Sequence, residues 1–294
     1  MLRLFLFMLF SCSAFAAQAQ VVVTIKPLHS LVAAVTEGSG QAPLLLVDGK
    51  TSLHEFSLKP SQAKALHEAR VVFYMSDGFE SFLSRILPQL SSSARRSAME
   101  KAPGIMFYPV QRSEDPHDHC EHAAHDMHLW MSPANARAMT SEIARVLADS
   151  YPEHAALFAK NAAALDGKLQ ALDSSLRPRM AKLRDKPFIV FHDAMQYFNR
   201  SYGLRNLGAI TLHPEQGISA GHVSELRRKV QEAGAVCVFR EPHYDGNIID
   251  NIMRGTEAKT TVLDPEAALL PADADLYFRM MEAVASALEN CLSS

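Results

Sequence analysis

Histidines are concentrated in one short stretch of this chain, residues 115–133, which reads DPHDHCEHAAHDMHLWMSP. Neutral imidazole is the commonest nitrogen ligand for metals such as zinc, and a His-rich tract that also contains Asp, Glu and Cys is a metal-binding composition. The other interpretation is a solvated polar loop. Five of the thirteen histidines fall in this stretch: His117, His119, His122, His125 and His128.

The last histidine of the stretch differs from the other four. His128 is followed by the apolar string LWM and then by an expected helix start, so we expect the fold to hold it in place. The other four lie in a polar His-rich loop, 115–127, which would form a secondary metal site. Ordering that loop costs conformational entropy and weakens its binding. We therefore expect deletion of 115–126 to reduce the number of bound metal ions and to leave the tightest site intact.

Three further candidate ligands are isolated in the sequence. His54 lies in TSLHEFSLKPSQ, His192 ends the string PFIVFH, and Asp264 ends TTVLD. These residues and His128 follow strand-like runs, and open α/β sheets bind ligands at the carboxyl ends of their strands. Three imidazoles and one carboxylate would complete a tetrahedral zinc shell. The alternatives are hydrogen-bonded structural histidines and, for Asp264 before Pro265, a turn residue.

The elements that must position these residues alternate between strand and helix in the first half of the chain. Such alternation predicts βα units and a mostly parallel sheet with helices on its faces. The expected strands are 21–25, 44–47, 71–75 and 105–110, and the expected helices are 28–36, 61–68 and 79–87.

Two helices are expected after the His-rich loop. Ser132-Pro133 is a typical helix start, and apolar residues continue at helical spacing to about Ser150. A longer apolar stripe then runs through 151–186, past Pro178. A helix over most of that segment would be a rod of about 45 Å, long enough to tie two lobes together.

The second half repeats the alternation, so we expect an α/β protein with two parallel-sheet lobes. The N-terminal lobe would span 20–150, the linker helix 151–186 and the C-terminal lobe 187–294. The expected strands of the second lobe are 188–191, 207–212, 236–239 and 261–263, and its helices 194–202, 220–232, 247–254 and 275–291.

The first 19 residues have the composition of a cleaved signal peptide, with a basic start, an apolar run from Leu4 to Phe10 and a small-residue cleavage site before Gln20. A lipoprotein anchor at Cys12 is the second interpretation. Without Arg3 the mature chain has 28 basic and 32 acidic side chains, about −4 in all. This charge argues against a nucleic-acid or anionic-membrane partner. We expect a soluble, exported protein.

Three cysteines remain after cleavage: Cys120, Cys237 and Cys291. In an exported protein, Cys237 in a strand-like run and Cys291 in the last helix can form a disulfide. Cys237 as a buried free thiol is the alternative. Cys120 lies inside the His-rich loop, where a thiolate could join a metal.

Four strings of the sequence resemble the metal-binding motifs of one family. They are HEFSLKPS from His54, HLWMSP from His128, FHDA around His192 and LDP around Asp264. Together with the His-rich insertion and the cysteine pair, their order and spacing closely resemble the zinc-specific solute-binding proteins of ABC transporters, the ZnuA type. The resemblance covers essentially the whole mature chain.

The resemblance implies two α/β lobes joined by a long rigid helix, with the metal in the cleft between them and a disulfide between Cys237 and Cys291. It also implies that His54, His128 and His192 are imidazole ligands. Asp264 would be the carboxylate ligand or a near neighbour of the metal. Relatives often have an acidic residue before the first histidine, where this chain has Leu53 and carries Glu55 on the other side, so Glu55 and water are the other choices for the fourth ligand.

The function that the resemblance implies is capture of Zn²⁺ in the periplasm and delivery to the permease of an ABC transporter. We expect a monomer and no enzymatic activity. Three imidazoles favour zinc over manganese, but a manganese- or iron-type receptor and a metal-binding adhesin of the same fold are the alternatives. A zinc hydrolase would need a general base, for which Glu55 and Glu241 are candidates, but no HExxH motif supports them.

Overall fold

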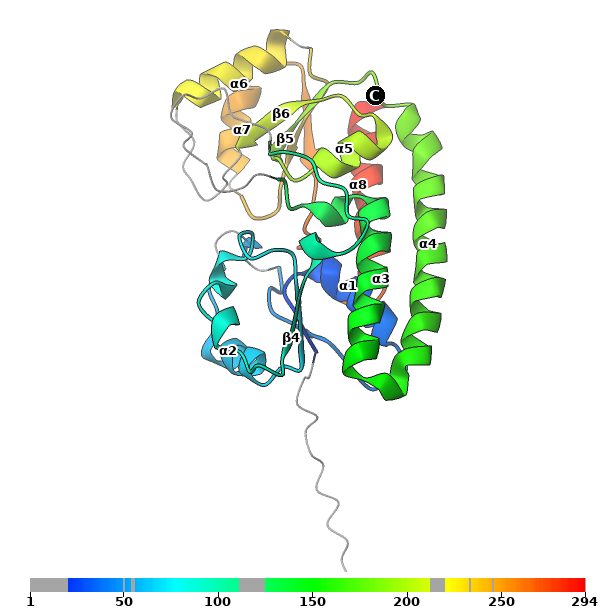
Figure 1. The fold of residues 1–294 in the computed structure, drawn as a ribbon. Helices are drawn as coiled ribbons and strands as arrows, with labels where there is room; N and C mark the ends of the chain where they lie inside the picture. Colours follow the sequence, from blue (N-terminus) through cyan, green and yellow to red (C-terminus); the bar gives the residue numbers. More distant parts are fainter. Residues whose placement is uncertain are drawn as a thin grey trace, which may run out of the picture.

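The structure is a computed structural model that describes residues 21–49, 51–53, 56–110, 125–211, 220–232, 234–244 and 246–293. It contains two four-stranded parallel sheets, one in each lobe (Figure 1). The expected signal peptide, 1–19, lies outside the described residues. Within the ranges given above, no helix is both long and apolar enough to cross a membrane.

The N-terminal lobe is built on the sheet β2-β1-β3-β4, in which each neighbouring pair is parallel. Short β-branched and aromatic runs such as VVV and VVFY form its two central, fully buried strands. The elements are β1 Val21–Val23, α1 Lys26–Thr36, β2 Leu44–Leu45, α2 Pro60–His67, β3 Val71–Tyr74, β4 Arg95–Ala98 and α3 Pro133–Ser150, with single 3-10 turns at Ser81–Leu83, Leu87–Gln89, Met99–Lys101 and Leu129–Met131.

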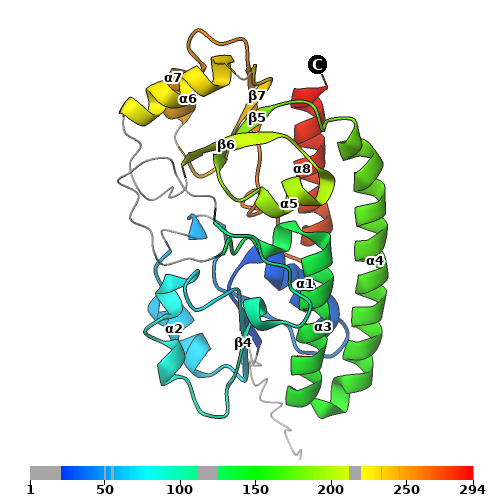
Figure 2. The same cartoon turned by 45° about the horizontal axis from the view of Figure 1, so that its top comes forward.

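The C-terminal lobe repeats this plan, with the strand order β6-β5-β7-β8 and all neighbours parallel. Helices α6 and α7 pack together over a small apolar cluster on one face of the sheet (Figure 2). The elements are β5 Phe188–His192, α5 Gln196–Tyr202, β6 Asn206–Thr211, α6 Ala220–Glu232, β7 Cys237–Arg240, α7 Gly246–Met253, β8 Lys259–Val262 and α8 Leu276–Leu292. The two-lobe α/β fold is thereby confirmed.

Helix α4, Ala155–Ala181, runs along both lobes after a 3-10 turn at Pro152–His154 (Figure 1). Its 27 residues make a rod of about 40 Å, and it continues through Pro178. The helix contacts α1 and α3 of the N-terminal lobe and α5 and α8 of the C-terminal lobe. Leu165, Leu169, Leu172 and Leu176 supply the predicted buried stripe.

Helix α8 is shared between the lobes. It packs on β8 and α4, and it also contacts α1 of the N-terminal lobe (Figure 2). At its start, the Tyr277 N–H donates to Ser30 Oγ at 3.0 Å, and Ser30 Oγ donates to the Ala274 carbonyl at 2.9 Å. One continuous core therefore extends from β1 through α4 and α8 to β5.

Two predicted elements of the N-terminal lobe are wrong. The fourth strand is β4, Arg95–Ala98, whose first two residues are exposed at the sheet edge and lack an apolar pattern. The apolar run 105–110 forms no strand of the sheet, because it packs against α5 of the other lobe through Tyr108 and Pro109. The expected helix 79–87 consists of separate 3-10 turns.

A disulfide joins Cys237 in β7 to Cys291 in α8, with 6.1 Å between the Cα atoms, as predicted. It closes a loop with a sequence separation of 54 residues, which stabilises the fold by about 4 kcal/mol in the chain-entropy model. The bond therefore fixes the last helix to a central strand of the C-terminal sheet.

Candidate metal centre

His128 and His192 come from different lobes and meet in the protein interior. Their ring centroids are 4.7 Å apart, and the rings are steeply inclined, at 68°. His128 directly precedes the 3-10 turn Leu129–Met131, and His192 is the last residue of β5. Two imidazoles bound to one zinc at about 2.0–2.1 Å must approach one another this closely. The pair is therefore placed for a shared metal.

Asp126 orients the ring of His128. Its Oδ1 lies 2.7 Å from His128 Nδ1, and it also accepts a hydrogen bond from the His128 backbone N–H at 2.9 Å. Burial raises the pKa of Asp126 to about 6, so the carboxylate is mostly ionised at neutral pH and accepts a hydrogen bond from Nδ1–H. Nε2 of His128 is then the nitrogen with a lone pair for a metal, the arrangement that carboxylates impose on metal-binding histidines.

The residues around Asp126 hold the base of the His-rich loop on the C-terminal lobe. The Asp126 N–H donates to the Tyr108 carbonyl at 2.9 Å, and Tyr197 Oη of α5 donates to the Asp126 carbonyl at 2.6 Å. Pro109 and His125 form an isolated antiparallel bridge directly beside these bonds. Deletion of 115–126 would therefore remove a group that orients His128, and on this ground we expect the deletion to weaken the tightest site as well.

Aromatic rings enclose His128. Its ring centroid lies 5.3 Å from Phe79 and 5.1 Å from Trp130. Trp130 is fixed in turn, because its Nε1–H donates to the Pro265 carbonyl at 2.9 Å and Tyr277 Oη donates to the Trp130 carbonyl at 2.8 Å. These bonds join the HLWM string to the C-terminal lobe.

Glu241 lies beside His192 at the switch point of the C-terminal sheet, the place between β5 and β7 where the strand order reverses. β5 and β7 are neighbours, and their connections leave toward opposite edges of the sheet, which is where open α/β sheets bind ligands. Glu241 directly follows β7, and its Oε1 is 3.4 Å from His192 Nδ1. Glu241 therefore faces the Nδ1 side of the ring, and Nε2 is the nitrogen on the opposite side.

Burial keeps both imidazoles neutral. Removal from water lowers the pKa of His128 to about 3 and that of His192 to about 4, and the adjacent His128 lowers the latter further. Neutral imidazole is the form that binds zinc. Protons therefore compete with a metal at this pair only well below the ordinary histidine range near 6.5.

Hydrogen bonds to its own Asp264 and from Lys26 of α1 fix the conformation of the loop after β8. Both carboxylate oxygens of Asp264 accept backbone N–H groups, from Ala268 at 2.9 Å and Leu269 at 3.0 Å. Lys26 Nζ at the start of α1 donates to the carbonyls of Ala267, Ala268 and Leu270, the longest of these bonds being 3.2 Å. Ala267 has a φ of 56°, a left-handed conformation that a non-glycine residue keeps only where its surroundings enforce it.

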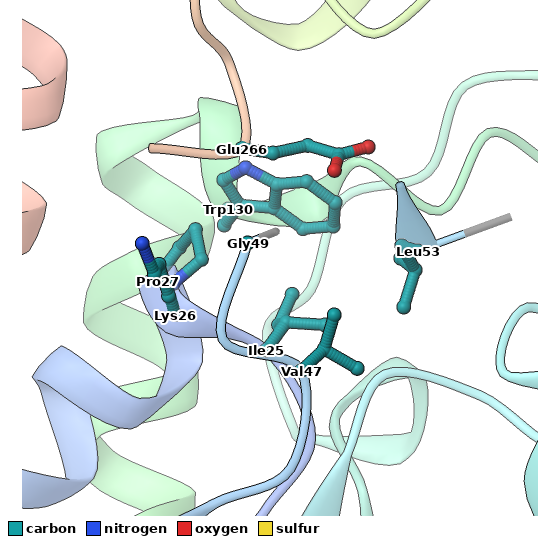
Figure 3. Close-up of a pocket in the computed structure, with 8 residues that line it drawn as sticks. All are labelled: Ile25, Lys26, Pro27, Val47, Gly49, Leu53, Trp130 and Glu266. Atoms are coloured by element: carbon teal, nitrogen blue, oxygen red, sulfur yellow. The ribbon is translucent and has the colours of Figure 1, made fainter. Parts of the chain in front are cut away.

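Glu266 is the acidic side chain of this loop that faces the centre, and sequence reasoning missed it. Figure 3 shows its carboxylate extending past the Trp130 indole on the side of Leu53, in a pocket that Lys26 also lines. Burial raises the pKa of Glu266 to about 7, and its charge acts on His192. A second acid two residues after Asp264 was visible in the sequence, but nothing there indicated which of the two pointed inward.

Several predicted site residues lie outside the described part of the chain. These are His54 and Glu55, and His117, His119, Cys120 and His122 of the loop. His125 is described and is exposed, with its ring 5.1 Å from Phe107. Within the described ranges, no three His, Cys, Asp or Glu side chains are grouped closely enough to hold a metal ion.

The buried acids give the metal-free protein a specific pH dependence. Burial raises the pKa of Glu241 to about 8 from an ordinary value of 4.5. Between these values the folded state keeps a proton that the unfolded state has lost, so rising pH favours unfolding. Metal-free Glu241→Gln should therefore melt at a higher temperature than wild type at pH 8, and the gap should narrow toward pH 5.

Thermal melts of chelator-treated protein across this range measure the effect. Glu232→Gln is the control, because Glu232 is exposed on α6 and should leave the melting temperature unchanged. If the melting temperatures of Glu241→Gln and wild type differ by the same amount at pH 5 and pH 8, the raised pKa of Glu241 is not the cause of the difference.

Comparison with known proteins places the chain in a family. The profile of the family described as zinc-uptake complex component A, periplasmic (ZnuA), matches residues 21–291. The high-affinity zinc uptake system protein ZnuA of Brucella suis biovar 1 is 36% identical over 306 residues, covering 93% of this chain and 91% of that protein. The protein of the same name from Haemophilus ducreyi is 30% identical over 294 residues, covering 94% of each.

Solved structures share the fold. A mutant laminin-binding adhesin from Streptococcus agalactiae matches with a TM-score of 0.78 at 22% identity, covering 93% of this chain and 99% of that one. At this identity the likeness shows the two-lobe fold alone. The family profile and the Brucella relative go further, and the chain belongs to the family of periplasmic A components of zinc-uptake complexes.

Proposed function

We propose that this protein is a periplasmic receptor that captures Zn²⁺ with high affinity and delivers it to the membrane permease of an ABC transporter. The observation that carries the proposal is the pair of buried, neutral imidazoles of His128 and His192, one from each lobe, 4.7 Å apart. Membership in the zinc-uptake family supports zinc as the cargo. The signal peptide expected at 1–19 supports export, and we propose that the receptor acts as a monomer.

The ligand set that we propose contains three imidazoles, from His54, His128 and His192. The segment that ends at Leu53 is described, and Leu53 lies with Glu266 and Trp130 in the pocket of Figure 3. His54 follows Leu53 directly in the sequence, and this supports its inclusion in the ligand set. Asp126 and Glu241 would orient two of the three rings.

For the fourth position we propose Glu266, with Asp264 as the near neighbour that shapes the loop. Both oxygens of Asp264 already accept backbone N–H groups, whereas the charge of Glu266 acts on His192. Zinc bound at this site would displace the proton that burial keeps on Glu266 near neutral pH.

The donor set favours zinc over the alternative metals. Manganese and iron(II) sites of this kind would use harder, carboxylate ligands in place of an imidazole, and His192 occupies that position here. The adhesin alternative has only the shared fold in its favour. The zinc-uptake relatives match at higher identity, and we therefore propose transport.

The His-rich loop is proposed as a weaker, secondary metal site. Its base is the Pro109–His125 bridge, close to Asp126 and hence to His128. A metal ion collected there would be released near the tight site.

Of the predictions that follow from the proposed function, the first concerns the imidazole pair. His128→Ala or His192→Ala should weaken zinc binding by more than about 100-fold, since each removes a neutral donor rather than a group that only orients one. Isothermal calorimetry or competition with a chelator measures the change. His29→Ala is a matched control, because His29 is also buried but lies against Pro43 in the N-terminal lobe. Tight zinc binding in the double variant would contradict the ligand assignment.

The second prediction separates the two acids of the loop after β8. Glu266→Gln should weaken zinc binding at least about tenfold and leave the metal-free melting temperature equal or higher, because it removes a buried carboxyl. Asp264→Asn should instead lower the metal-free melting temperature, because the amide nitrogen cannot accept a backbone N–H. The reverse pattern would assign the ligand to Asp264.

The third prediction concerns the loop. Replacing 112–123 by a Gly-Ser link should lower the number of zinc ions per protein and keep the tight site, because the Pro109–His125 bridge already brings the ends together. Metal analysis after dialysis counts the ions. The longer deletion, 115–126, should also weaken the tight site, because it removes Asp126. Unchanged stoichiometry in the shorter deletion would exclude metal binding by the loop.

A further inference from the structure

Tyr244 contacts the two segments that lead into the metal centre. It lies in the 241–244 segment after β7, and its ring stacks on Phe191 with centroids 4.5 Å apart and an interplanar angle of 19°. Phe191 directly precedes His192. The Tyr244 hydroxyl donates a hydrogen bond to Ser52 Oγ of the N-terminal lobe at 2.9 Å.

The N-terminal segment that Tyr244 reaches is buried and has a second contact with the other lobe. Ser52 is 2% exposed and Leu53 is 4% exposed. The Leu53 backbone N–H lies near enough to the Glu266 carboxylate to lower the pKa of that acid, and both residues line the pocket of Figure 3. Two loops of the C-terminal lobe, one after β7 and one after β8, therefore lie against the 51–53 segment.

On the far side of His54 the chain is held by its own lobe. The Phe56 ring packs edge-on against Phe82, with centroids 4.9 Å apart. The N-terminal segment is thus anchored to the C-terminal lobe before His54 and to the N-terminal lobe after it. A separation of the lobes at this place must break the Tyr244–Ser52 bond.

We propose that Tyr244 is a positioning residue that fastens the 51–53 segment to the C-terminal lobe and thereby slows zinc release. The inference rests on the proposed zinc-receptor function and adds a group that touches no metal. The phenol acts on both lobes at once, through its ring on Phe191 and its hydroxyl on Ser52. Loss of the Tyr244–Ser52 bond should change mainly the dissociation rate of zinc, because this bond must break before the ion leaves.

The test is a double-mutant cycle on zinc release. Tyr244→Phe keeps the stacked ring and removes the hydroxyl, and Ser52→Ala removes its acceptor. Each single variant should release zinc to an excess of chelator about three- to tenfold faster than wild type, the range expected for one net hydrogen bond. The double variant should be no faster than either single variant, because both changes remove the same bond.

Three controls distinguish positioning from general stability. Tyr74→Phe removes a hydroxyl that bonds Asp77 within the N-terminal lobe at 2.8 Å, and it should leave zinc release unchanged. The melting temperatures of the metal-free single variants should differ from wild type by no more than that of Tyr74→Phe. The visible spectrum of the cobalt-substituted Tyr244→Phe protein should match wild type, because the ligands are the same.

The outcomes separate this inference from the proposed function. Tight zinc binding with an unchanged release rate in Tyr244→Phe overturns the inference alone, as do rate increases that multiply in the double variant. A wild-type protein that binds no zinc overturns the proposed function and this inference with it.

Discussion

The centre depends on keeping two imidazoles neutral where they are removed from water. Removal from water disfavours the charged imidazolium, so burial itself keeps both rings neutral. Asp126 lies against Nδ1 of His128, and Glu241 lies against Nδ1 of His192. Asp126 orients its ring through a hydrogen bond, and in both pairs Nε2 is the nitrogen on the side of the ring away from the acid. Helices α4 and α8 hold the two lobes, and hence the two rings, at the required distance.

The two sheets have the same strand order, and the switch point lies between β1 and β3 in one and between β5 and β7 in the other. Different side chains occupy the two switch points. In the N-terminal lobe the Glu80 carboxylate fills this place, accepting bonds from the Met75 and Ser76 backbone N–H groups and from the Thr24 hydroxyl. In the C-terminal lobe the corresponding place holds His192 and Glu241. One switch point is therefore closed by internal hydrogen bonds, and the other presents an imidazole to the facing lobe.

Three side chains form hydrogen bonds between the lobes around the centre. The Trp130 indole bonds to Pro265, Lys26 bonds to three carbonyls of the 264–270 loop, and Tyr244 bonds to Ser52. Each of these bonds joins residues more than 130 positions apart in the chain. The loop after β8 is consequently shaped as much by α1 as by its own residues, and this explains why Glu266 and Asp264 play different parts.

The sequence by itself determined the elements whose cause is local. Alternating apolar runs predicted the parallel strands other than β4, Ser132 capped α3 as its position indicated, and the cysteine pair formed its disulfide. Only the tertiary structure decided which polar groups meet. In the sequence, Asp126 is one of several acids in a His-rich loop, and only the structure shows its carboxylate bonded to His128. The 105–110 run has the apolar pattern of a strand, and only the structure shows that it packs against α5 of the other lobe. Periodicity reports on a residue's own element, whereas pairing across two lobes depends on how those elements pack.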